Sequence, residues 1–308
     1  MDASSSATFK SGFVAVMGRP NVGKSTLINV LLGQKIAAVS PRPQTTRRRQ
    51  LGIYTSSTAQ VIFVDTPGVH HPRHKLGEAM NQQAREALEE ADLVLWILDT
   101  SQPPAPEDLL IADLIRSCQL QKVTILVQNK IDLLPPDLLA QRQADFQALL
   151  PAAAQVFVSA TRGDGCQELL NLIIERLPVG PMYYPEEQIT DLYERDIAAD
   201  LIREAALIHL RDEVPHGLAV RIDEYKERSE QTTYIAATLI LERETHKPIV
   251  IGKDGAMLKK IGMAARQEIE NLIGRKVFLD LRVKVRKNWR DDEASLRALG
   301  FTKPEKAK

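Results

Sequence analysis

The sequence has 308 residues, 44% of them hydrophobic and 26% charged, which is typical of a folded globular protein about two domains long. Its 40 Lys and Arg residues balance 40 Asp and Glu residues, so the charge of the whole chain argues against a nucleic-acid binder. The longest wholly apolar run, Leu93 to Leu98, is too short to cross a membrane and the N-terminus resembles no signal or transit peptide, so we expect a cytoplasmic protein.

Residues 1–178 alternate short apolar runs with helical patterns. Strands are expected at Phe13–Met17, Val61–Asp65, Leu93–Asp99, Val123–Gln128 and Gln155–Ser159. Helices are expected at Lys24–Leu32, Leu76–Ala91, Glu107–Cys118, Asp137–Leu150 and Cys166–Leu177. A weaker strand, Leu51–Tyr54, is expected at an edge, antiparallel to the Val61–Asp65 strand. Because most strands are apolar on both faces, the pattern predicts an α/β fold with a doubly wound sheet.

Three prolines between Pro178 and Pro185 indicate a linker over residues 179–196. Residues 197–308 are expected to form a second, α+β domain with a C-terminal tail, in the order α-β-β-α-α-β. Its expected elements are Ile197–Val214, Leu218–Arg228, Tyr234–Arg243, Ala256–Ile261, Met263–Ile273 and Lys276–Arg286.

A phosphate-binding loop is predicted directly after the first strand, where the pattern GxxxxGK[ST] opens a helix. Its residues are Gly18, Arg19, Pro20, Asn21, Val22, Gly23, Lys24, Ser25 and Thr26. The glycines let backbone N–H groups wrap the phosphates, Lys24 supplies a positive charge, and the Ser25 hydroxyl ligates Mg²⁺. This context predicts a P-loop nucleotide-binding domain.

A second phosphate-side motif, Asp65-Thr66-Pro67-Gly68, ends a buried strand about forty residues later. Asp65 can hold Mg²⁺ through water, and the N–H of Gly68 can meet the γ-phosphate. Val69 follows directly.

Base recognition is predicted at two later strand ends. Asp132 of the Asn129-Lys130-Ile131-Asp132 motif can accept hydrogen bonds from guanine N1–H and the 2-amino group, which adenine does not offer. Asn129 would brace the loop and Lys130 would cover the base. The Ser159-Ala160-Thr161 segment would present the Ala160 N–H to guanine O6. The motifs together predict GTP and GDP as ligands, with Mg²⁺.

The loop between the first helix and the Leu51–Tyr54 strand reads SPRPQTTRRRQ. Either Thr45 or Thr46 is expected to reach Mg²⁺ in the GTP state, and we favour Thr46. The Arg47-Arg48-Arg49 run is either a solvated basic loop or a contact with RNA or a partner.

A candidate RNA site lies in the second domain, where Ile251, Gly252, Lys253, Asp254 and Gly255 lead into a helix through a GxxG pattern. Such glycines allow close approach of a nucleic-acid backbone, and the α-β-β-α-α-β order around them resembles the type II KH domain. Residues 201–308 hold 22 Lys and Arg against 17 Asp and Glu, so the neutral total hides a basic second domain. The expected RNA track adds Lys259, Lys260, Arg282, Lys284 and Arg286.

Two isoleucines and one tryptophan of the second domain can contribute either to RNA binding or to packing. Ile251 and Ile261 are expected to form the floor of the RNA groove rather than part of the core. Trp289 either stacks on a base or packs at the domain edge.

Across the whole chain, GRPNVGKST, PQTTR, DTPGVHHP, NKID and the GxxG segment together resemble the Era family of bacterial GTPases. The resemblance implies a GTPase that binds the 3′ end of small-subunit (16S) ribosomal RNA and the 30S precursor. It also implies peripheral association with the inner membrane as an open alternative. We expect a monomer, because nothing in the sequence suggests a dimer interface.

Val69 stands where Ras-like enzymes carry a water-positioning Gln, so the resemblance implies help for hydrolysis from elsewhere. Related GTPases use the P-loop Asn to hold K⁺, which suggests K⁺-stimulated hydrolysis through Asn21; the alternative is that Asn21 only closes the loop. Catalysis would then rest on Lys24, Asn21, Thr46 and Gly68. His70, His71 and His74 are expected in an exposed switch loop rather than at a metal, because Pro72 breaks their register.

The sequence thus predicts a GTPase switch whose nucleotide state controls RNA binding by a KH domain during 30S maturation. Two alternatives stay open. One is an RNA-binding scaffold with structural GTP, and the other is a membrane-recruited signalling GTPase in which RNA binding is incidental.

Overall fold

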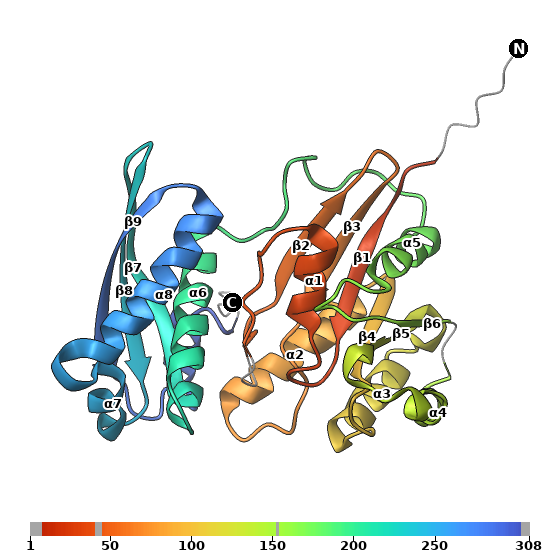
Figure 1. Cartoon of the computed structure of the whole chain (residues 1–308), viewed down its shortest axis with the longest axis horizontal. Helices are drawn as coiled ribbons and strands as arrows, with labels where there is room; N and C mark the ends of the chain where they lie inside the picture. The colour runs from red at the N-terminus through yellow and green to blue at the C-terminus, as the bar shows by residue number, and fades with distance from the viewer. Residues whose placement is uncertain (1–7, 41–44, 152–153, 303–308) are drawn as a thin grey trace, which may run out of the picture. The chain divides into compact units, whose positions relative to one another are not determined.

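The structure is a computed structural model that describes residues 8–40, 45–151 and 154–302 (Figure 1). The chain divides into two compact units. The first runs to residue 35 and continues over 49–71 and 81–191, whereas the second takes up 36–48, 72–80 and 192 onward. Two short segments that lie in the first domain by sequence order therefore group with the second unit. Pro41, Arg42, Pro43 and Gln44 of the loop after the first helix lie outside the described residues.

The first unit is built on a six-stranded sheet in the order β2-β3-β1-β4-β5-β6. Its strands are β1 (Lys10–Met17), β2 (Gln50–Thr55), β3 (Ala59–Asp65), β4 (Leu93–Asp99), β5 (Thr124–Asn129) and β6 (Ala154–Phe157). Among these described strands, β2 at the edge is the one that runs antiparallel to its neighbour. The predicted doubly wound sheet with an antiparallel edge strand is confirmed.

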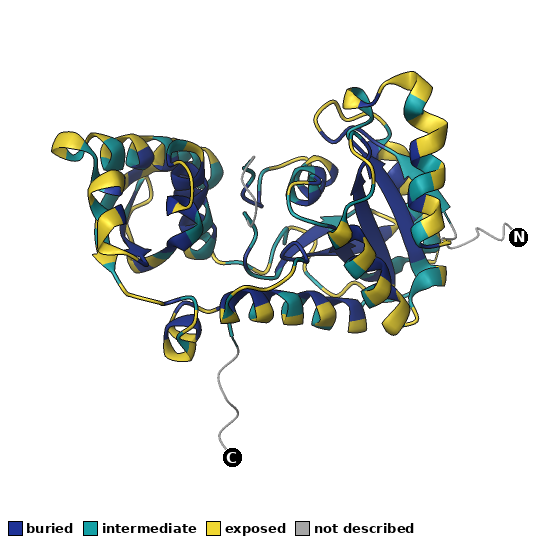
Figure 2. Ribbon diagram, turned by 90° about the horizontal axis from the view of Figure 1, so that it is seen from below, coloured by how far each residue is buried: buried dark blue, intermediate teal, exposed yellow. Residues whose placement is uncertain are grey.

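Helices cover both faces of this sheet. They are α1 (Lys24–Leu32), α2 (Lys75–Glu89), α3 (Pro106–Ser117), α4 (Leu139–Leu149) and α5 (Cys166–Arg176). α1 and α5 contact each other on one face, and side chains of α2, α3 and α4 pack with Met17, Trp96 and Leu126 on the other. Figure 1 shows the backbone of these helices around the sheet. Every residue of β3 and β4 is buried (Figure 2), as predicted for strands covered on both faces.

Most predicted boundaries in this unit are close to the observed ones. The helix Lys24–Leu32 and the strand Leu93–Asp99 match at both ends, and the others shift by a few residues. No helix in the described part of the chain is both long and apolar enough to cross a membrane.

The second unit has a three-stranded sheet, β7-β8-β9, in which β8 pairs antiparallel with β7 and parallel with β9. Its elements are α6 (Glu194–His209), β7 (Leu218–Ser229), β8 (Thr232–Leu241), α7 (Lys247–Ile251), α8 (Ala256–Ile273), β9 (Lys276–Val285) and α9 (Glu293–Ala298). The predicted α-β-β-α-α-β order is confirmed. The first helix, however, ends at His209 rather than Val214, because the next residue, Leu210, is extended with φ −89° and ψ 161°.

The prediction of two helices, Ala256–Ile261 and Met263–Ile273, is wrong. Both form the single helix α8, and the other helix of the pair is α7, before the GxxG segment. Gly262 does not interrupt α8. A glycine at this position serves packing, because a Cβ there would come within 3.3 Å of Leu281 Cδ1 on β9. The glycine therefore marks a close approach between the helix and the strand.

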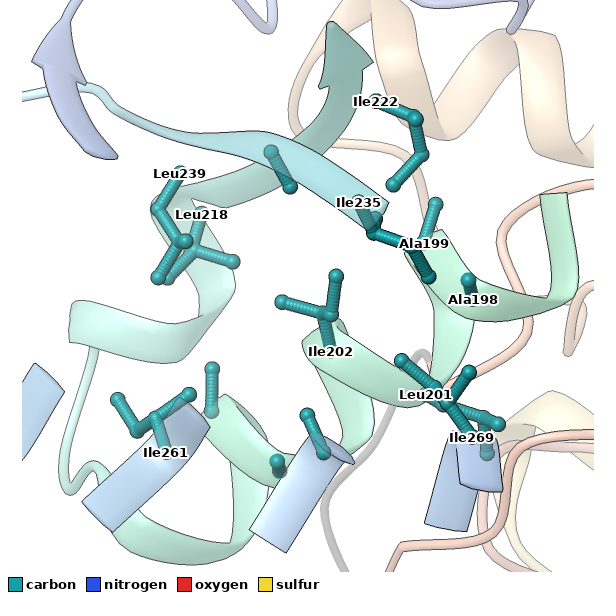
Figure 3. Close-up of a cluster of buried hydrophobic side chains, with 14 of the residues drawn as sticks. Ala198, Ala199, Leu201, Ile202, Leu218, Ile222, Ile235, Leu239, Ile261 and Ile269 are labelled. Atoms are coloured by element: carbon teal, nitrogen blue, oxygen red, sulfur yellow. The ribbon is translucent and has the colours of Figure 1, made fainter. Parts of the chain in front are cut away.

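A hydrophobic core lies between the sheet and the helices of the second unit (Figure 3). Ile202 of α6, Leu239 of β8 and Ile261 of α8 are all fully buried within it. The expectation that Ile261 forms the floor of an RNA groove is therefore wrong. Its position on α8, between Met257 and Ala265 at helical spacing, turns it toward the core.

A smaller apolar cluster in this unit is built around Trp289. Its other members are Leu76, Met80, Ala219, Ile240, Leu296, Leu299 and Phe301. Trp289 is completely buried, and its Nε1 donates to the carbonyl oxygen of Gly217 over 2.9 Å. The packing role is confirmed, and stacking on a base is excluded by burial. Residues 72–80 thus contribute side chains to the hydrophobic interior of the second unit.

Candidate nucleotide and RNA sites

The P-loop joins β1 to α1 in the first unit, as predicted. The Lys24 ammonium is buried and donates to the carbonyl oxygens of Gly18 and Arg19 over 3.0 and 3.1 Å. Burial lowers the pKa of Lys24 from 10.5 to about 8, although the nearby carboxylate of Asp65 opposes the shift. A phosphate group placed in the loop would restore the favourable environment of the charged form.

Asn129 connects the base-recognition loops to the P-loop. Its Nδ2 donates to the carbonyl oxygen of Val22 over 2.7 Å, and its Oδ1 accepts from the N–H of Ala160 over 3.0 Å. Gly23 makes this approach feasible, because a Cβ there would lie 2.4 Å from Asn129 Nδ2 and the φ of 101° disfavours any side chain. The bracing role expected for Asn129 has a clear geometric basis. The N–H of Ala160, expected to meet guanine O6, is here bonded to Asn129.

Asp132 and Ser159 lie together at the ends of β5 and β6. Ser159 Oγ donates to Asp132 Oδ1 over 2.7 Å and lies 3.2 Å from the hydroxyl of the exposed Thr161. The hydrogen bond orients the carboxylate that is expected to receive the two guanine donors. Side chains of the two motifs predicted to recognise the base therefore contact each other in the structure.

The candidate Mg²⁺ ligands Ser25 and Asp65 also meet. Ser25 Oγ donates to Asp65 Oδ2 over 2.9 Å, and Gln50 Nε2 reaches the same oxygen at 3.3 Å. A hydroxyl and a carboxylate side by side are the hard oxygen donors that Mg²⁺ prefers, so the residues fit the ion. Thr66, by contrast, turns its hydroxyl away to the carbonyl oxygen of Val16.

Gly68 and Pro67 are buried next to the P-loop. A Cβ on Gly68 would lie 2.8 Å from the backbone nitrogen of Pro20, so only glycine allows this approach. Asn21 is exposed and takes a left-handed φ of 66°, whereas Thr26 is half-buried in the first turn of α1. The two phosphate-side motifs therefore lie against one another.

Two acidic residues that the sequence analysis missed organise the basic residues of the site. Asp99, at the end of β4, accepts a hydrogen bond from Lys130 Nζ over 2.7 Å. Asp108, on α3, lies 3.4 Å from the guanidinium of Arg19. Burial raises the pKa of Asp99, but hydrogen bonds from Lys130 and Ser101 outweigh it, and the net shift is downward. The available signal for Asp99 was its place at the carboxyl end of a buried parallel strand.

The residues after Gly68 pack inward before the chain becomes exposed. Val69 is buried in the core of the first unit, and Asn81 Nδ2 donates to the carbonyl oxygen of His70. His71 is exposed, and His74 is half-buried and paired with Asp291 at 2.8 Å. No group of three or more potential metal-ligating side chains was found within residues 8–40, 45–151 and 154–302.

Residues 45–48 are held by the second unit, to which they belong. Arg203 of α6 donates to the carbonyl oxygen of Thr45 over 2.6 Å, and Thr46 is half-buried. Arg47 is buried: it donates to the carbonyl oxygens of Leu218 and His216 over 2.8 and 2.7 Å. The expectation of a solvated loop is wrong for Arg47, and burial also excludes its direct contact with RNA.

The two following arginines form ion pairs in different units. Arg48 lies 3.9 Å from carboxylate oxygens of both Asp196 and Asp200 of α6, within the second unit. Arg49 pairs with Glu90 at 2.5 Å within the first unit. Charge pairing, rather than solvation of the whole run, is the main feature of this segment.

An open cleft of about 480 Å³ lies beside the GxxG segment, between α8 and β9 of the second unit. Its lining residues are Gly255, Leu258, Lys259, Gly262, Met263, Arg266, Val277, Phe278, Leu279 and Leu281. Of these described residues two are cationic and none is acidic, as suits a polyanion. Gly255 and Lys259 are the predicted RNA residues that line the cleft.

The other predicted RNA residues lie around the cleft or away from it. Lys253, Asp254 and Lys260 are exposed, while Ile251 and Gly252 are partly buried. Arg282 and Lys284 are also exposed, on the face of β9 opposite to Leu279 and Leu281, and Arg286 is exposed directly after the strand. Arg282 pairs with Asp280 and Arg286 with Asp292. Arg266 was missed, although it lies seven residues after Lys259 and so on the same face of α8.

Relatives of known family match almost the whole chain. The GTPase Era of Geobacter metallireducens is 46% identical over 295 residues, which cover 96% of this chain and 98% of that protein. The chain belongs to the Era family of GTPases. The GTPase Era of Carboxydothermus hydrogenoformans is 44% identical over 97% of this chain and 100% of its own length.

Two described families match successive parts of the chain. Residues 13–130 match the 50S ribosome-binding GTPase family and residues 213–290 match the KH domain family. An Era crystal structure in complex with MgGDPNP and nucleotides 1506–1542 of 16S ribosomal RNA superposes with a TM-score of 0.90. It is 41% identical and covers 95% of this chain and 99% of that one. A crystal structure of an Aquifex aeolicus Era variant bound to GDP·AlF₄⁻ matches with the same TM-score, identity and coverage.

The family establishes the chemistry that the motifs predicted. As an Era-family member, the chain is a GTPase that uses GTP, GDP and Mg²⁺, and its second domain is a KH domain. The predicted fold class, a P-loop G domain followed by a KH domain, is confirmed.

Proposed function

We propose that the protein is a GTP-hydrolysing switch that binds the 3′ region of 16S ribosomal RNA through its KH domain and acts on the 30S precursor during maturation. The observation that supports this most strongly is the presence of both sites in one chain. Asn129 and Ser159 organise a guanine site, and Lys259 and Arg266 give the KH cleft a positive lining. The Era structure that matches this chain contains both MgGDPNP and 16S ribosomal RNA.

In the proposed reaction, water attacks the γ-phosphate and the residues of the first unit neutralise the developing charge. Lys24 binds the β- and γ-phosphates, and its protonated form is favoured once they are present. Ser25 and Thr46 would hold Mg²⁺, with Asp65 contributing through water, and the ion would supply charge neutralisation at the phosphates. The N–H of Gly68 meets the γ-phosphate, and backbone N–H groups of the P-loop align the rest.

Val69 cannot orient the attacking water, because its side chain has no hydrogen-bonding group and is buried in the core. We therefore assign part of the charge stabilisation to K⁺ held at Asn21, whose exposed side chain lies on the P-loop. The turnover number of the wild-type protein should then rise when K⁺ replaces Na⁺, and Asn21→Ala should abolish the difference. If the K⁺ dependence survives in Asn21→Ala, Asn21 only closes the loop.

The proposed switch depends on the position of Thr46 between Thr45 and Arg47. Both neighbours are held by hydrogen bonds of the second unit, so a Thr46 that ligates Mg²⁺ would couple the nucleotide to those contacts. We expect the RNA affinity of the full chain to differ between the GTP-analogue and GDP states. Fluorescence anisotropy with an oligonucleotide of the 3′ region of 16S ribosomal RNA measures this, and equal affinities would refute the switch.

Three further experiments distinguish the proposed function from its alternatives. Single-turnover hydrolysis that is no faster than in a Lys24→Ala variant would favour a scaffold with structural GTP. Flotation with vesicles of anionic phospholipid, with GTP analogue or GDP, tests the peripheral membrane association. Crosslinking of bound RNA in cells, followed by sequencing, tests the 30S precursor as the target.

A further inference from the structure

An exposed aromatic ring forms part of the rim of the KH cleft. Phe278 of β9 is 60% exposed, and it lines the cleft together with Lys259 and Arg266 of α8. Met263, on the α8 wall of the same cleft, is 53% exposed. Large apolar side chains are usually buried, so an exposed aromatic ring at the rim of a cleft points to an apolar ligand group at that place.

The Phe278 ring is already stacked on its inner neighbour. Its centroid lies 5.8 Å from that of Tyr234, with 23° between the ring planes, and the two residues are directly paired across β8 and β9. The guanidinium of Arg228, on β7, lies 4.4 Å from the centroid of the Tyr234 ring. Because β8 lies between β7 and β9, the three side chains form a row across the sheet that ends at Phe278.

We propose that Phe278 is a stacking platform for one unpaired RNA base at the rim of the cleft, supported by Tyr234 and Arg228. The geometry of the row leaves Phe278 as the terminal, exposed ring at the edge of the sheet where the cleft opens. A nucleobase has the flat π-face that completes such a row, and base–aromatic stacking tolerates every base.

The charges around the ring identify the ligand as single-stranded nucleic acid rather than an apolar peptide. Lys259 and Arg266 are the charged residues of the cleft lining, and both are cationic. They suit the phosphates on either side of a base held at Phe278, and Gly255 of the GxxG segment continues the same cleft. This inference rests on the proposed RNA-binding function and names an additional base-binding position within it.

The platform can be tested with the full chain in the presence of Mg²⁺ and a GTP analogue. The probe is an oligonucleotide of the 3′ region of 16S ribosomal RNA with 2-aminopurine at one position at a time, because stacking quenches its fluorescence. We expect one position to be quenched by the wild-type protein. Phe278→Leu should remove the quenching and weaken RNA binding about 5- to 150-fold, whereas Phe278→Tyr should preserve both.

A matched control is available in the first unit. Tyr183 is 50% exposed and contacts Phe13 with 5.5 Å between ring centroids, so Tyr183→Leu removes a comparable exposed aromatic far from the cleft in sequence. It should leave RNA binding and quenching unchanged.

Two outcomes would overturn the platform, and they differ. If Phe278→Leu binds the RNA within about twofold of wild type with the same quenching, the Tyr234–Phe278 pair serves only the stability of the sheet. If the wild-type protein itself binds no RNA, the proposed RNA function fails and the platform fails with it. The thermal unfolding midpoint and GTPase rate of Phe278→Leu, both expected to stay near wild type, confirm that the variant is folded.

Discussion

Lys130 Nζ donates to Asp99 Oδ2 over 2.7 Å, which connects the loop expected to cover the guanine base to the end of the neighbouring strand β4. Asp99 belongs to none of the sequence motifs for nucleotide binding. Its carboxylate is largely buried, so the hydrogen bond is only weakly screened by solvent. Lys130 also has a left-handed φ of 66°, a conformation that a fixed side chain helps to hold.

Replacing this carboxylate should weaken nucleotide binding. In Asp99→Asn, Lys130 loses its charged acceptor and becomes mobile over the base, so we expect the Kd for GDP to rise about 5- to 100-fold. Titration with a fluorescent GDP analogue measures it. Asp113→Asn on α3, which removes an exposed partner of Arg116, is the control and should leave the Kd unchanged. An unchanged Kd in Asp99→Asn would show that Lys130 is positioned by the backbone alone.

The lowered pKa of Lys24 predicts proton uptake on nucleotide binding. Between about pH 8 and 10.5 the free folded protein holds Lys24 largely neutral, whereas phosphates in the P-loop favour its charged form. The affinity for GDP should therefore fall by up to about tenfold per pH unit above the pKa of Lys24. Calorimetry in buffers of different ionisation enthalpy should detect up to one proton taken up in this range. Lys24→Arg keeps the charge without titrating, so uptake that persists in this variant would assign the proton to another group.

The lowered pKa of Lys24 also affects the stability of the nucleotide-free protein, which should rise with pH where the affinity for GDP falls. In the unfolded chain Lys24 regains its ordinary pKa, so the unfolded state binds more protons between about pH 8 and 10.5. Lys24 therefore makes the free energy of unfolding rise with pH across this window. Denaturation of the Lys24→Met variant should show a weaker rise than the wild type, and a parallel pH dependence would contradict the assignment.

Arg47 should contribute more to stability than its neighbour Arg49. Arg47→Lys cannot satisfy both carbonyl oxygens of Leu218 and His216, and it loses the approach of the guanidinium to the Trp289 ring at 5.8 Å. We expect the free energy of unfolding to fall by about 1 to 3 kcal/mol. Arg49→Lys retains a partly exposed ion pair with Glu90 and should change it by less than about 0.5 kcal/mol. Urea denaturation of both variants provides the comparison, and equal losses would be inconsistent with a buried anchor at Arg47.

Trp289→Phe distinguishes packing from RNA contact. The smaller ring leaves a gap in the cluster with Leu76 and Phe301 and removes the donor to Gly217, so we expect a loss of about 1 to 4 kcal/mol. RNA affinity, measured well below the unfolding midpoint, should remain close to that of the wild type. A clear loss of affinity would contradict a role of Trp289 in packing alone.

The features that the sequence predicted well are local. The strand Leu93–Asp99 is apolar along nearly its whole length because both faces are covered, and that requirement is visible in the residues themselves. The P-loop is similarly local, since Gly18 to Ser25 determine the backbone path through their own conformations. Asn129, Asp132 and Ser159 were predicted from two short motifs that follow buried strands, and hydrogen bonds of Asn129 and Ser159 bring these motifs together.

The features that were missed depend on partners far away in sequence. Arg47 is buried and donates to carbonyl oxygens of residues that lie 169 and 171 positions later in the chain. No pattern around Arg47 indicates these partners. Gly262 suggests a helix break by its propensity, but burial of Ile261, Ala265 and Ile269 on one face stabilises a continuous α8. The role of Asp99 depends on its hydrogen bond with Lys130. The motif that contains Lys130 predicts a contact with the base and does not indicate this acidic partner.

The grouping of residues 36–48 and 72–80 with the second unit has a consequence for how this protein can be divided. A fragment that begins at the linker lacks Leu76 and Met80, so the faces of Ala219, Ile240 and Trp289 that they cover would meet water. Arg47 would be missing as well, leaving two buried carbonyl groups without their donor. Residues after the linker therefore do not form the complete interior of the KH domain. A stable fragment of this domain must also contain residues 36–48 and 72–80.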